Sequence, residues 1–337
     1  MQEQKTGFLR WPRNNPMVKE SGAMHAIQKA LRTKNIGLLL FLVLVWVVIS
    51  RITPYFLQGN NILLVLDQTA TVAIAGVGMT YVIISGGVDL SVGGIAALSG
   101  MMAGICITKW GMSFAPALVL AMLVGVIVGL INGLLISYFN LQPMICTLGT
   151  LSAARGLTLI STSGRPIFVI NPTFNLVGNG DVFGIPFPVI IAVLVFVIGH
   201  IVLTYTEFGR YVFAIGGNQE ATRLSGINVK RYKTMIYIIS GFCAALVGIV
   251  LVGILGASEP TVGQGLELDS IAVTAIGGTN LMGGIGGLVG TMLGSLLIGT
   301  IKNSLTILNI VSYYQQVVIG VIIILAVLLE YFRKRRA

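Results

Sequence analysis

Two short segments of similar sequence contain the residues best suited to chemistry. Residues 86–94 read GGVDLSVGG and residues 277–284 read GGTNLMGG, and each segment joins two apolar runs. Both contain a glycine pair, an acid or its amide, a leucine and a second glycine pair. Glycine-interrupted segments at matching positions of duplicated halves often mark the pathway of a transporter. Asp89 and Asn280 are therefore candidates for a solute pathway, although close helix packing explains the glycines equally well.

The carboxyl group of Asp89 allows two interpretations. A charged side chain at the centre of a bilayer costs roughly 2.5–3.5 kcal/mol on insertion scales, so such residues commonly serve a function. Asp89 also stands directly before the run LSVGGIAALSG, where a carboxylate can accept hydrogen bonds from the first free N–H groups of a helix. We expect an N-cap rather than a proton relay.

Further polar residues lie inside apolar runs. The additional pathway candidates are Gln68, Asn132, Thr147 and Asp269. Each of them can equally hydrogen-bond between helices, which is a common use of polar residues in membrane proteins. Arg155 lies deep in its run and needs either a partner or water, so lining a pathway and making a structural pair both stay open.

The sequence predicts no catalytic residue, metal site or cofactor. Cys106, Cys146 and Cys243 stand singly in apolar runs, without the spacing of a metal site or a disulfide framework. A phosphate-binding loop needs the pattern G-x-x-x-x-G-K-[ST], and no lysine in this chain follows a glycine. We therefore expect a chain that is not an enzyme, with any ATP hydrolysis on another polypeptide.

The elements that must position these residues are membrane-spanning helices. Of the 337 residues, 55% are hydrophobic and only 9% are charged, whereas a soluble domain has about 25% charged residues. A span needs about 20 mostly apolar residues. Candidate runs lie near 36–52, 62–84, 89–108, 113–137, 144–162, 186–205, 234–256, 266–279, 284–302 and 313–331. The predicted fold class is an all-α integral membrane protein of about ten transmembrane helices with an internal repeat. The run 266–279 is short and contains Glu267 and Asp269, so it is the candidate for a broken or re-entrant helix.

The basic residues are distributed as the positive-inside rule requires. Seven of the 21 Lys and Arg residues precede the first run, five lie in 206–233 and four lie in 333–336. An even number of spans puts all three groups on the cytoplasmic side. We therefore expect residues 1–35 and 332–337 to be cytoplasmic tails of a transmembrane domain over 36–331. The net charge of +10 is then a topology signal, and no nucleic-acid partner is expected.

The cytoplasmic segment 206–233 contains a distinct helix signal. Within it, residues 218–227 read NQEATRLSGI. Asn218 can cap a helix, Glu220 suits its first turn and Gly226 can end it. A short helix between two spans is suited to being held by another protein, because both of its ends are tied to membrane helices. Attraction of Arg223 and its basic neighbours to anionic lipid is the alternative interpretation.

Four segments resemble those of a known family. They are GGVDLSVGG at 86–94, FGRYVFAIGGNQEATRLSGINVKRYK at 208–233, GLELDSIAVTAIGGTNLMGG at 265–284 and SYYQQVVIGVIIILAV at 312–327. They are similar to segments of the permease subunits of bacterial ATP-binding-cassette (ABC) sugar importers, in the group of ribose, xylose, arabinose and galactose permeases. The similarity covers most of the chain from residue 36 onward, and the second and third segments are the specific ones.

The resemblance implies a function, partners and a coupling site. The function is import of a pentose or hexose across the bacterial inner membrane. The implied partners are an ABC ATPase subunit, an external periplasmic sugar-binding protein, a second permease copy that we expect to be identical, and membrane lipid. The residues that the resemblance assigns to ATPase coupling are Glu220, Ala221, Thr222, Arg223, Leu224, Ser225 and Gly226.

A self-sufficient carrier driven by an ion gradient, or a passive facilitator, is the alternative function. Such a carrier requires buried carboxylates that face a site at the bilayer midplane. The candidates are Asp67, Asp89 and Asp269, and all three lie near the ends of predicted spans. Their positions favour the importer, while the identity of the sugar stays open.

Overall fold

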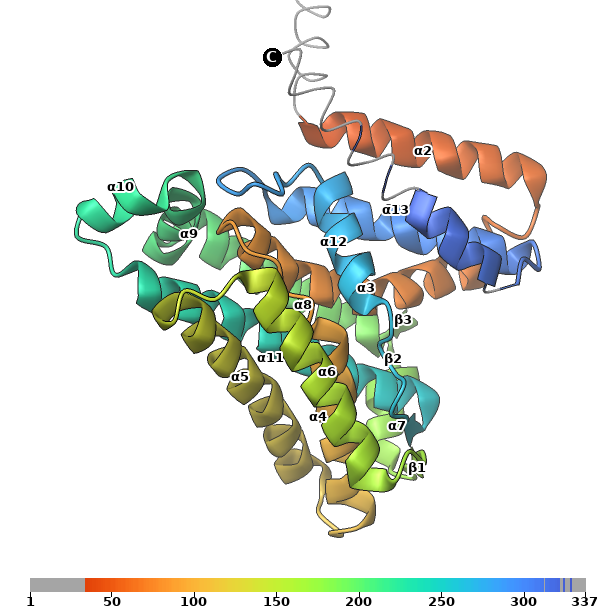
Figure 1. Cartoon of the computed structure of the whole chain (residues 1–337). Helices are drawn as coiled ribbons and strands as arrows, with labels where there is room; N and C mark the ends of the chain where they lie inside the picture. The colour runs from red at the N-terminus through yellow and green to blue at the C-terminus, as the bar shows by residue number, and fades with distance from the viewer. Residues whose placement is uncertain (1–33, 312, 322–323, 325–327, 329–337) are drawn as a thin grey trace, which may run out of the picture.

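The computed structural model describes residues 34–311, 313–321, 324 and 328. Its helices are α2 (Lys34–Ile52), α3 (Gly59–Ile84), α4 (Val92–Thr108), α5 (Phe114–Tyr138), α6 (Pro143–Thr162), α7 (Pro172–Asn179), α8 (Phe187–Tyr205), α9 (Glu207–Gly217), α10 (Gln219–Leu224), α11 (Val229–Leu255), α12 (Leu266–Ile276) and α13 (Leu288–Ile307). Two antiparallel strand pairs join β1 (Ile167–Phe168) to β4 (Ala257–Ser258) and β2 (Asp181–Val182) to β3 (Ile185–Pro186). Figure 1 shows the helices gathered around α3, α4 and α11, with α9 and α10 together at one corner.

Seven of the described helices are long and apolar enough to cross a membrane, namely α2, α3, α5, α6, α8, α11 and α13. Their bounds follow the predicted runs within about five residues, which confirms a multi-pass, all-α membrane protein. The number ten is not confirmed. Helix α4 has 17 residues and is shorter than each of these seven helices. The predicted run 313–331 lies partly outside the described residues. Of the two predicted tails, only residues 34 and 35 are described.

Helix α12 is too short to cross a bilayer alone. Its 11 residues extend over about 16 Å at 1.5 Å per residue, which is roughly half of a hydrocarbon core of about 30 Å. This length agrees with the broken or re-entrant helix predicted for 266–279. Glu267 and Asp269 both lie in its first turn, where acidic residues are favoured by the helix dipole.

The core is built by α3 and α11. Their largest buried side chains include Tyr81, Ile83, Ile236 and Tyr237, each no more than 1% exposed. Helix α11 also crosses α5 at very close range, because a Cβ on Gly125 or on Gly241 would overlap the other residue's carbonyl oxygen. Close backbone approach through small residues is how helices gain packing energy in lipid.

Helix α3 ends in a glycine motif that starts the first repeated segment. The N–H of Gly87 donates to the carbonyl oxygen of Val82 at 3.0 Å, and Gly86 has a φ of 81°. A left-handed glycine just after the last helical residue satisfies the free carbonyls of a helix end. The chain then turns through residues 87–91 before α4 begins.

The segment 163–185, which its Pro, Gly and Asn content predicts to be rich in turns, is structured. Strand β1 pairs with the distant strand β4. Helix α7 follows β1 in the chain, and β2 and β3 then form a hairpin. The side chain of Asn171 accepts hydrogen bonds from the backbone N–H groups of Thr173 and Phe174 and so caps α7.

The segment 206–233 is mostly helical rather than a loop. Helix α9 begins directly after α8, and α11 begins at Val229, five residues before the predicted start of its span at 234. The boundary is wrong because Asn228 caps α11 by accepting from the N–H of Arg231, so the helix includes a basic first turn that hydropathy alone excludes.

Candidate translocation and coupling sites

Asp89 lies at the centre of a fully buried polar cluster. Its Oδ1 atom accepts hydrogen bonds from the backbone N–H of Ser91 at 2.9 Å and from the Ser91 hydroxyl. Its Oδ2 atom accepts from the hydroxyl of Ser240 on α11 at 2.7 Å. Asp89, Ser91 and Ser240 are each no more than 1% exposed. The carboxylate therefore fastens the segment between α3 and α4 to α11.

Asn132 and Thr147 complete this cluster. The side-chain amide of Asn132 on α5 donates to the Ser91 hydroxyl at 2.8 Å. The hydroxyl of Thr147 on α6 accepts from the backbone N–H of Leu90 at 3.0 Å. Three predicted pathway residues, Asp89 among them, thus meet in space. All three are buried and bonded to protein groups, so in this conformation they join helices and do not face a passage.

The prediction that Asp89 is an N-cap is wrong. Helix α4 begins at Val92, and its N-cap residue is Ser91, whose side chain makes no capping bond. The Asp89 carboxylate instead accepts from the N–H two residues along the chain, which is an Asx turn, and from α11. A buried carboxylate requires hydrogen-bond donors, and neighbouring hydroxyl groups provide them here.

We expect Asp89→Ala to destabilise the folded chain. The substitution leaves the Ser91 and Ser240 donors buried without their acceptor, and each such group costs about 1–3 kcal/mol. Thermal unfolding in detergent should therefore shift to lower temperature. Glu259→Ala is the matched control, because Glu259 is an exposed carboxylate and such surface changes usually alter stability by less than about 0.5 kcal/mol. Equal melting temperatures for the two variants would contradict the structural role of the cluster.

Gln68 and Asp269 lie apart from this cluster. Gln68 is an exposed residue of α3. Asp269 forms an ion pair with Lys302, which joins α12 to α13, and both side chains are less than 30% exposed. The structure does not bring these two candidates together with Asp89.

Arg155 makes a structural pair. Its guanidinium Nη1 donates to the carbonyl oxygens of Pro260 at 2.9 Å and Val262 at 2.6 Å. Both carbonyls belong to the segment that leads into α12. Of the two roles that the sequence leaves open, the structure shows the structural one, in which α6 holds the chain just before the short helix.

Asn280 closes a turn that resembles the turn at Asp89. Its Oδ1 atom accepts from the backbone N–H of Met282 at 3.0 Å, two residues along the chain, as the Oδ1 atom of Asp89 also does. A left-handed glycine precedes each turn, Gly86 with a φ of 81° and Gly278 with a φ of 83°. Because Gly86 is the first glycine of its pair and Gly278 the second, the two segments share their turns but differ in register by one residue at the preceding helix end.

Helix α10 is the predicted coupling helix, and its ends lie where the sequence places them. The side chain of Asn218 accepts from the N–H of Ala221 at 2.9 Å, and Gly226 follows the helix with a φ of 83°. Glu220 and Arg223 form two hydrogen bonds, of 3.0 and 2.6 Å, and both side chains are more than 60% exposed. The hydrogen bond from Arg223 lowers the pKa of the Glu220 carboxyl, so this pair is ionised at neutral pH.

The other side chains of α10 and its C-cap residue Ser225 divide between an inner and an outer face. Thr222 is only 5% exposed, and its hydroxyl donates to the carbonyl oxygen of Asn218 at 2.8 Å. The hydroxyl of Ser225 donates to the carbonyl oxygen of Ala221 at 2.9 Å. Leu224 is 73% exposed. The outer face therefore combines an ion pair with an apolar side chain, a composition suited to contact with another protein.

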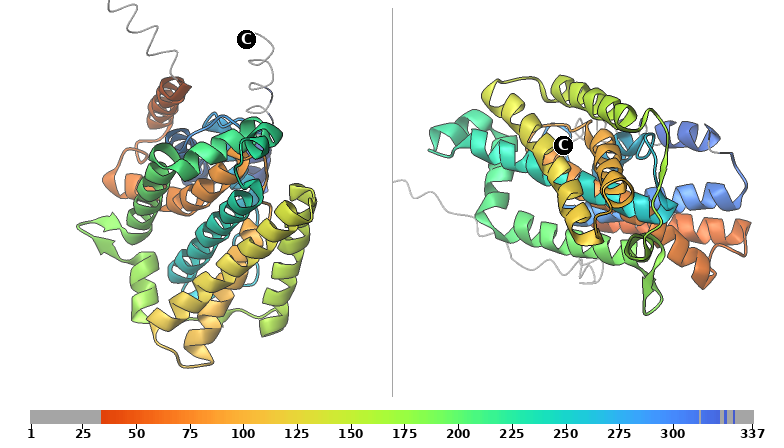
Figure 2. Two further views of the ribbon diagram at one scale, coloured as in Figure 1. Left: turned by 90° about the vertical axis from the view of Figure 1, so that its left-hand side faces the viewer. Right: turned by 90° about the horizontal axis from the view of Figure 1, so that it is seen from below.

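Helix α6 has an exposed face that the sequence reasoning missed. Helices α5 and α8 are as exposed as α6, yet each has about twice its mean hydropathy. Gly149 and Ser152 are exposed, and a Cβ on Gly149 would meet nothing within 4 Å. Both views in Figure 2 place α6, in yellow-green, at the edge of the bundle. Because polar groups in membrane segments face protein or water rather than lipid, this face suits a passage or another polypeptide.

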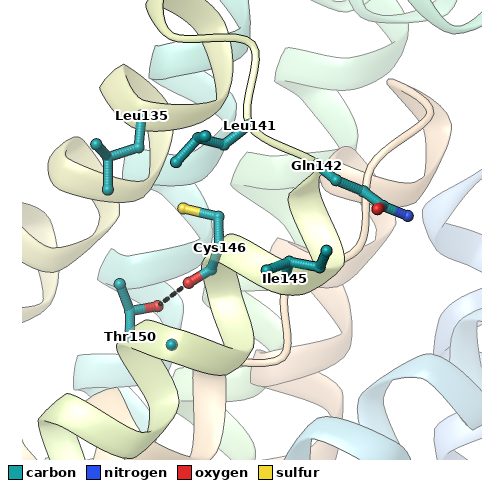
Figure 3. A pocket seen from close by; sticks show the side chains of 7 residues that line it. Leu135, Leu141, Gln142, Ile145, Cys146 and Thr150 are labelled. Carbon is teal, nitrogen blue, oxygen red and sulfur yellow. Dashed lines mark hydrogen bonds between the residues drawn. The ribbon is translucent and has the colours of Figure 1, made fainter.

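An open pocket lies at the start of this face (Figure 3). It is lined by Leu135, Leu141, Gln142, Ile145, Cys146, Gly149 and Thr150. The sequence signal for the face is the recurrence of Gly149, Ser152 and Gly156 at helical spacing within one run. The sequence singles out Thr147 and Arg155 in this run and not these three residues, because glycine and serine are common in close helix packing.

A model of one protein family matches residues 61–327. Its description is "Branched-chain amino acid transport system / permease component". The chain belongs to this family of transport permeases. Membership confirms the resemblance to ABC importer permeases that the four sequence segments indicated.

This permease is also similar to curated sugar permeases over nearly its whole length. It is 45% identical to the ribose import permease protein RbsC of Bacillus subtilis (strain 168) over 307 residues, which cover 90% of this chain and 94% of the relative. The identity to RbsC of Escherichia coli (strain K12) is 40%, covering 90% and 95%. The D-allose transport system permease protein AlsC of the same strain is 39% identical, covering 89% and 93%. No solved structure matches this permease.

Proposed function

We propose that this permease is the membrane-spanning subunit of an ABC importer that carries a monosaccharide, with ribose as the first candidate. The observation that carries the proposal is its similarity to ribose import permeases over nine-tenths of both chains. The family description names branched-chain amino acids, whereas relatives with this coverage are named for ribose and D-allose. The proposed substrate is therefore a pentose or hexose. The proposed location of the permease is the inner, cytoplasmic membrane of a bacterium.

In this proposal, α10 docks to a separate ABC ATPase. The seven residues from Glu220 to Gly226 form the docking element, with the exposed ion pair and Leu224 as its outer face. The arrangement of basic residues supports a cytoplasmic position for α10 and for both termini. ATP binding and hydrolysis in the partner would then displace α10 relative to the bundle.

A second copy of this permease and the exposed face of α6 complete the proposed passage. The low mean hydropathy of α6 supports a position against water or the second copy, whereas the apolar exposed faces of α5 and α8 suit membrane lipid. An external sugar-binding protein would deliver the sugar to the opposite end. The buried residues Asp89, Asn132 and Thr147 hold α4, α5, α6 and α11 beside this passage.

Reconstitution tests the proposed function directly. The tagged chain is purified from its native membrane, its co-purifying proteins are identified, and the complex is placed in liposomes with labelled ribose and the sugar-binding protein. We expect a co-purified ATPase and uptake that requires ATP on the α10 side. Accumulation of ribose by the chain alone under a proton or sodium gradient would instead establish the ion-coupled carrier.

A further inference from the structure

Three segments that are distant in sequence meet by direct backbone contact beside α10. They are the end of α3 at Ile84, the end of α9 at Gly216, and the loop 277–287 between α12 and α13. The N–H of Gly284 donates to the carbonyl oxygen of Ile84 at 2.8 Å. A Cβ on Gly216 would overlap that same carbonyl oxygen and would lie 2.6 Å from the nitrogen of Gly284. Figure 1 shows the loop between α12 and α13 reaching toward α9.

The loop side of this junction is closed on itself. The backbone N–H of Asn280 donates to the carbonyl oxygen of Ile285 at 2.8 Å, and its side-chain amide donates to the carbonyl oxygen of Gly283 at 3.1 Å. A Cβ on Gly283 would lie 2.9 Å from the carbonyl oxygen of Gly216 and 3.0 Å from the Cα of Gly86. The two repeated segments, 86–94 and 277–284, therefore contact each other, and the end of α9 packs against both.

The link from α9 to α10 is a single residue. The N–H of Asn218 donates to the carbonyl oxygen of Ala214 in α9 at 3.0 Å, and its own carbonyl accepts from the N–H of Thr222 in α10 at 3.0 Å. Asn218 is therefore hydrogen-bonded into both helices. A displacement of α10 cannot be absorbed by a flexible linker and must move the end of α9.

We infer that Gly216 is a positioning residue through which movement of α10 reaches both repeated segments. The inference rests on the proposed docking of α10 to an ATPase. The contact joins backbone to backbone, so no side chain can rotate to absorb the motion, and close-packed groups transmit displacement. From Ile84 the motion continues to the turn at Asp89, and from the loop 277–287 it continues to α12 and α13.

The test compares Gly216→Ala with Gly217→Ala. A Cβ at Gly217 would meet nothing within 4 Å, and both glycines are the last residues of the same helix, so the control adds the same methyl group without the clash. The readouts are the amount of assembled complex with the ATPase, the ATP hydrolysis rate, and ribose uptake per ATP hydrolysed in liposomes.

We expect the Gly216→Ala complex to assemble and hydrolyse ATP, while ribose uptake per ATP falls roughly tenfold. A change of this size lies within the range that allosteric coupling typically produces. Gly217→Ala should match the wild-type chain. An assembled Gly216→Ala complex with wild-type uptake per ATP would overturn the inference alone. Absence of ATP-driven uptake by the wild-type complex would overturn the proposed function as well, so the two failures are distinguishable.

A second measurement decides the case in which Gly216→Ala fails to accumulate. Spin labels are placed on the complex at Gln219→Cys in α10 and Met282→Cys in the loop, since both residues are exposed and Gln219 lies outside the seven proposed docking residues. The three native cysteines are buried. We expect the distance between these labels to stay constant on ATP binding, while the distance from Gln219→Cys to a label at Ile160→Cys on α6 changes. Movement of α10 relative to the loop would overturn the inference.

Discussion

Replacing Glu220 with lysine is expected to reduce ATP-driven uptake by roughly ten- to a hundredfold, in line with coupling free energies of about 1–3 kcal/mol. The substitution breaks the exposed ion pair with Arg223 and puts two positive charges on the outer face of α10. It also places a cation in the first turn of a helix, where the dipole favours an anion. The measurement is ribose uptake in membrane vesicles, together with the amounts of permease and of bound ATPase.

The matched control for this prediction lies one helix earlier. Glu207 and Arg210 form an ion pair of the same spacing in α9, and their side chains are 75% and 63% exposed. Glu207→Lys therefore changes the same charge in the same helical context, outside the proposed docking element. We expect Glu207→Lys to retain uptake. A Glu220→Lys variant that retains both the ATPase and normal uptake would show that α10 is not the coupling element.

The proposed loss in Glu220→Lys is insensitive to pH in the neutral range. The hydrogen bond from Arg223 lowers the pKa of the Glu220 carboxyl below its ordinary value, so the native pair is ionised at neutral pH and is lost only as the pH falls through that lowered pKa. Acidification from pH 8 to pH 6, both well above the ordinary glutamate pKa of about 4.3, should therefore leave the ratio of variant to wild-type uptake unchanged.

The spans could be predicted because each depends on a local property. About 20 apolar residues identify a crossing helix whatever its neighbours are, and the predicted runs agree with the described helices at most ends. Helix α11 shows where this reasoning stops. Its first turn is basic, and its start is fixed by the Asn228 side chain, which a hydropathy pattern does not register.

The coupling helix could also be predicted, since its signals are local. Asn218, Glu220 and Gly226 act within one helical turn of their own position, and α10 has the cap and the end that they specify. Asp89 differs because its partner Ser240 is 151 residues away. Sequence spacing gives no information on such a contact, so the sequence predicts only the donors at the neighbouring helix start.

Burial separates residues that hold the bundle from residues that can meet a solute. Asn132 and Thr147 are polar residues in apolar runs, as are Thr150 and Ser152, yet the sequence indicates only the first two as pathway candidates. The structure buries the first two completely and leaves Ser152 exposed. In this conformation a solute can contact only the second kind, which supports the proposal that the passage runs along the exposed face of α6.

A tryptophan at Gly149 is expected to block this passage. Because a side chain at this position meets nothing within 4 Å in the single chain, Gly149→Trp should fold and insert normally. If the face of α6 lines a passage shared with a second copy, an indole there occupies the space through which the sugar moves. We expect ribose uptake to fall by at least roughly tenfold, a barrier increase of about 1.4 kcal/mol, with the bound ATPase retained. The measurement is uptake by the reconstituted complex.

The control for Gly149→Trp separates a water-filled face from a lipid-facing one. Ile127 on α5 is 51% exposed in a helix of high mean hydropathy, so Ile127→Trp should leave uptake intact because lipid accommodates an additional ring. Cysteine labelling gives the same contrast without added bulk. A charged thiol reagent should modify Ser152→Cys, which lies on the exposed face of α6, and should leave Ile127→Cys unmodified. Normal transport by Gly149→Trp, or equal labelling at both positions, would place α6 in lipid and require the passage to lie elsewhere.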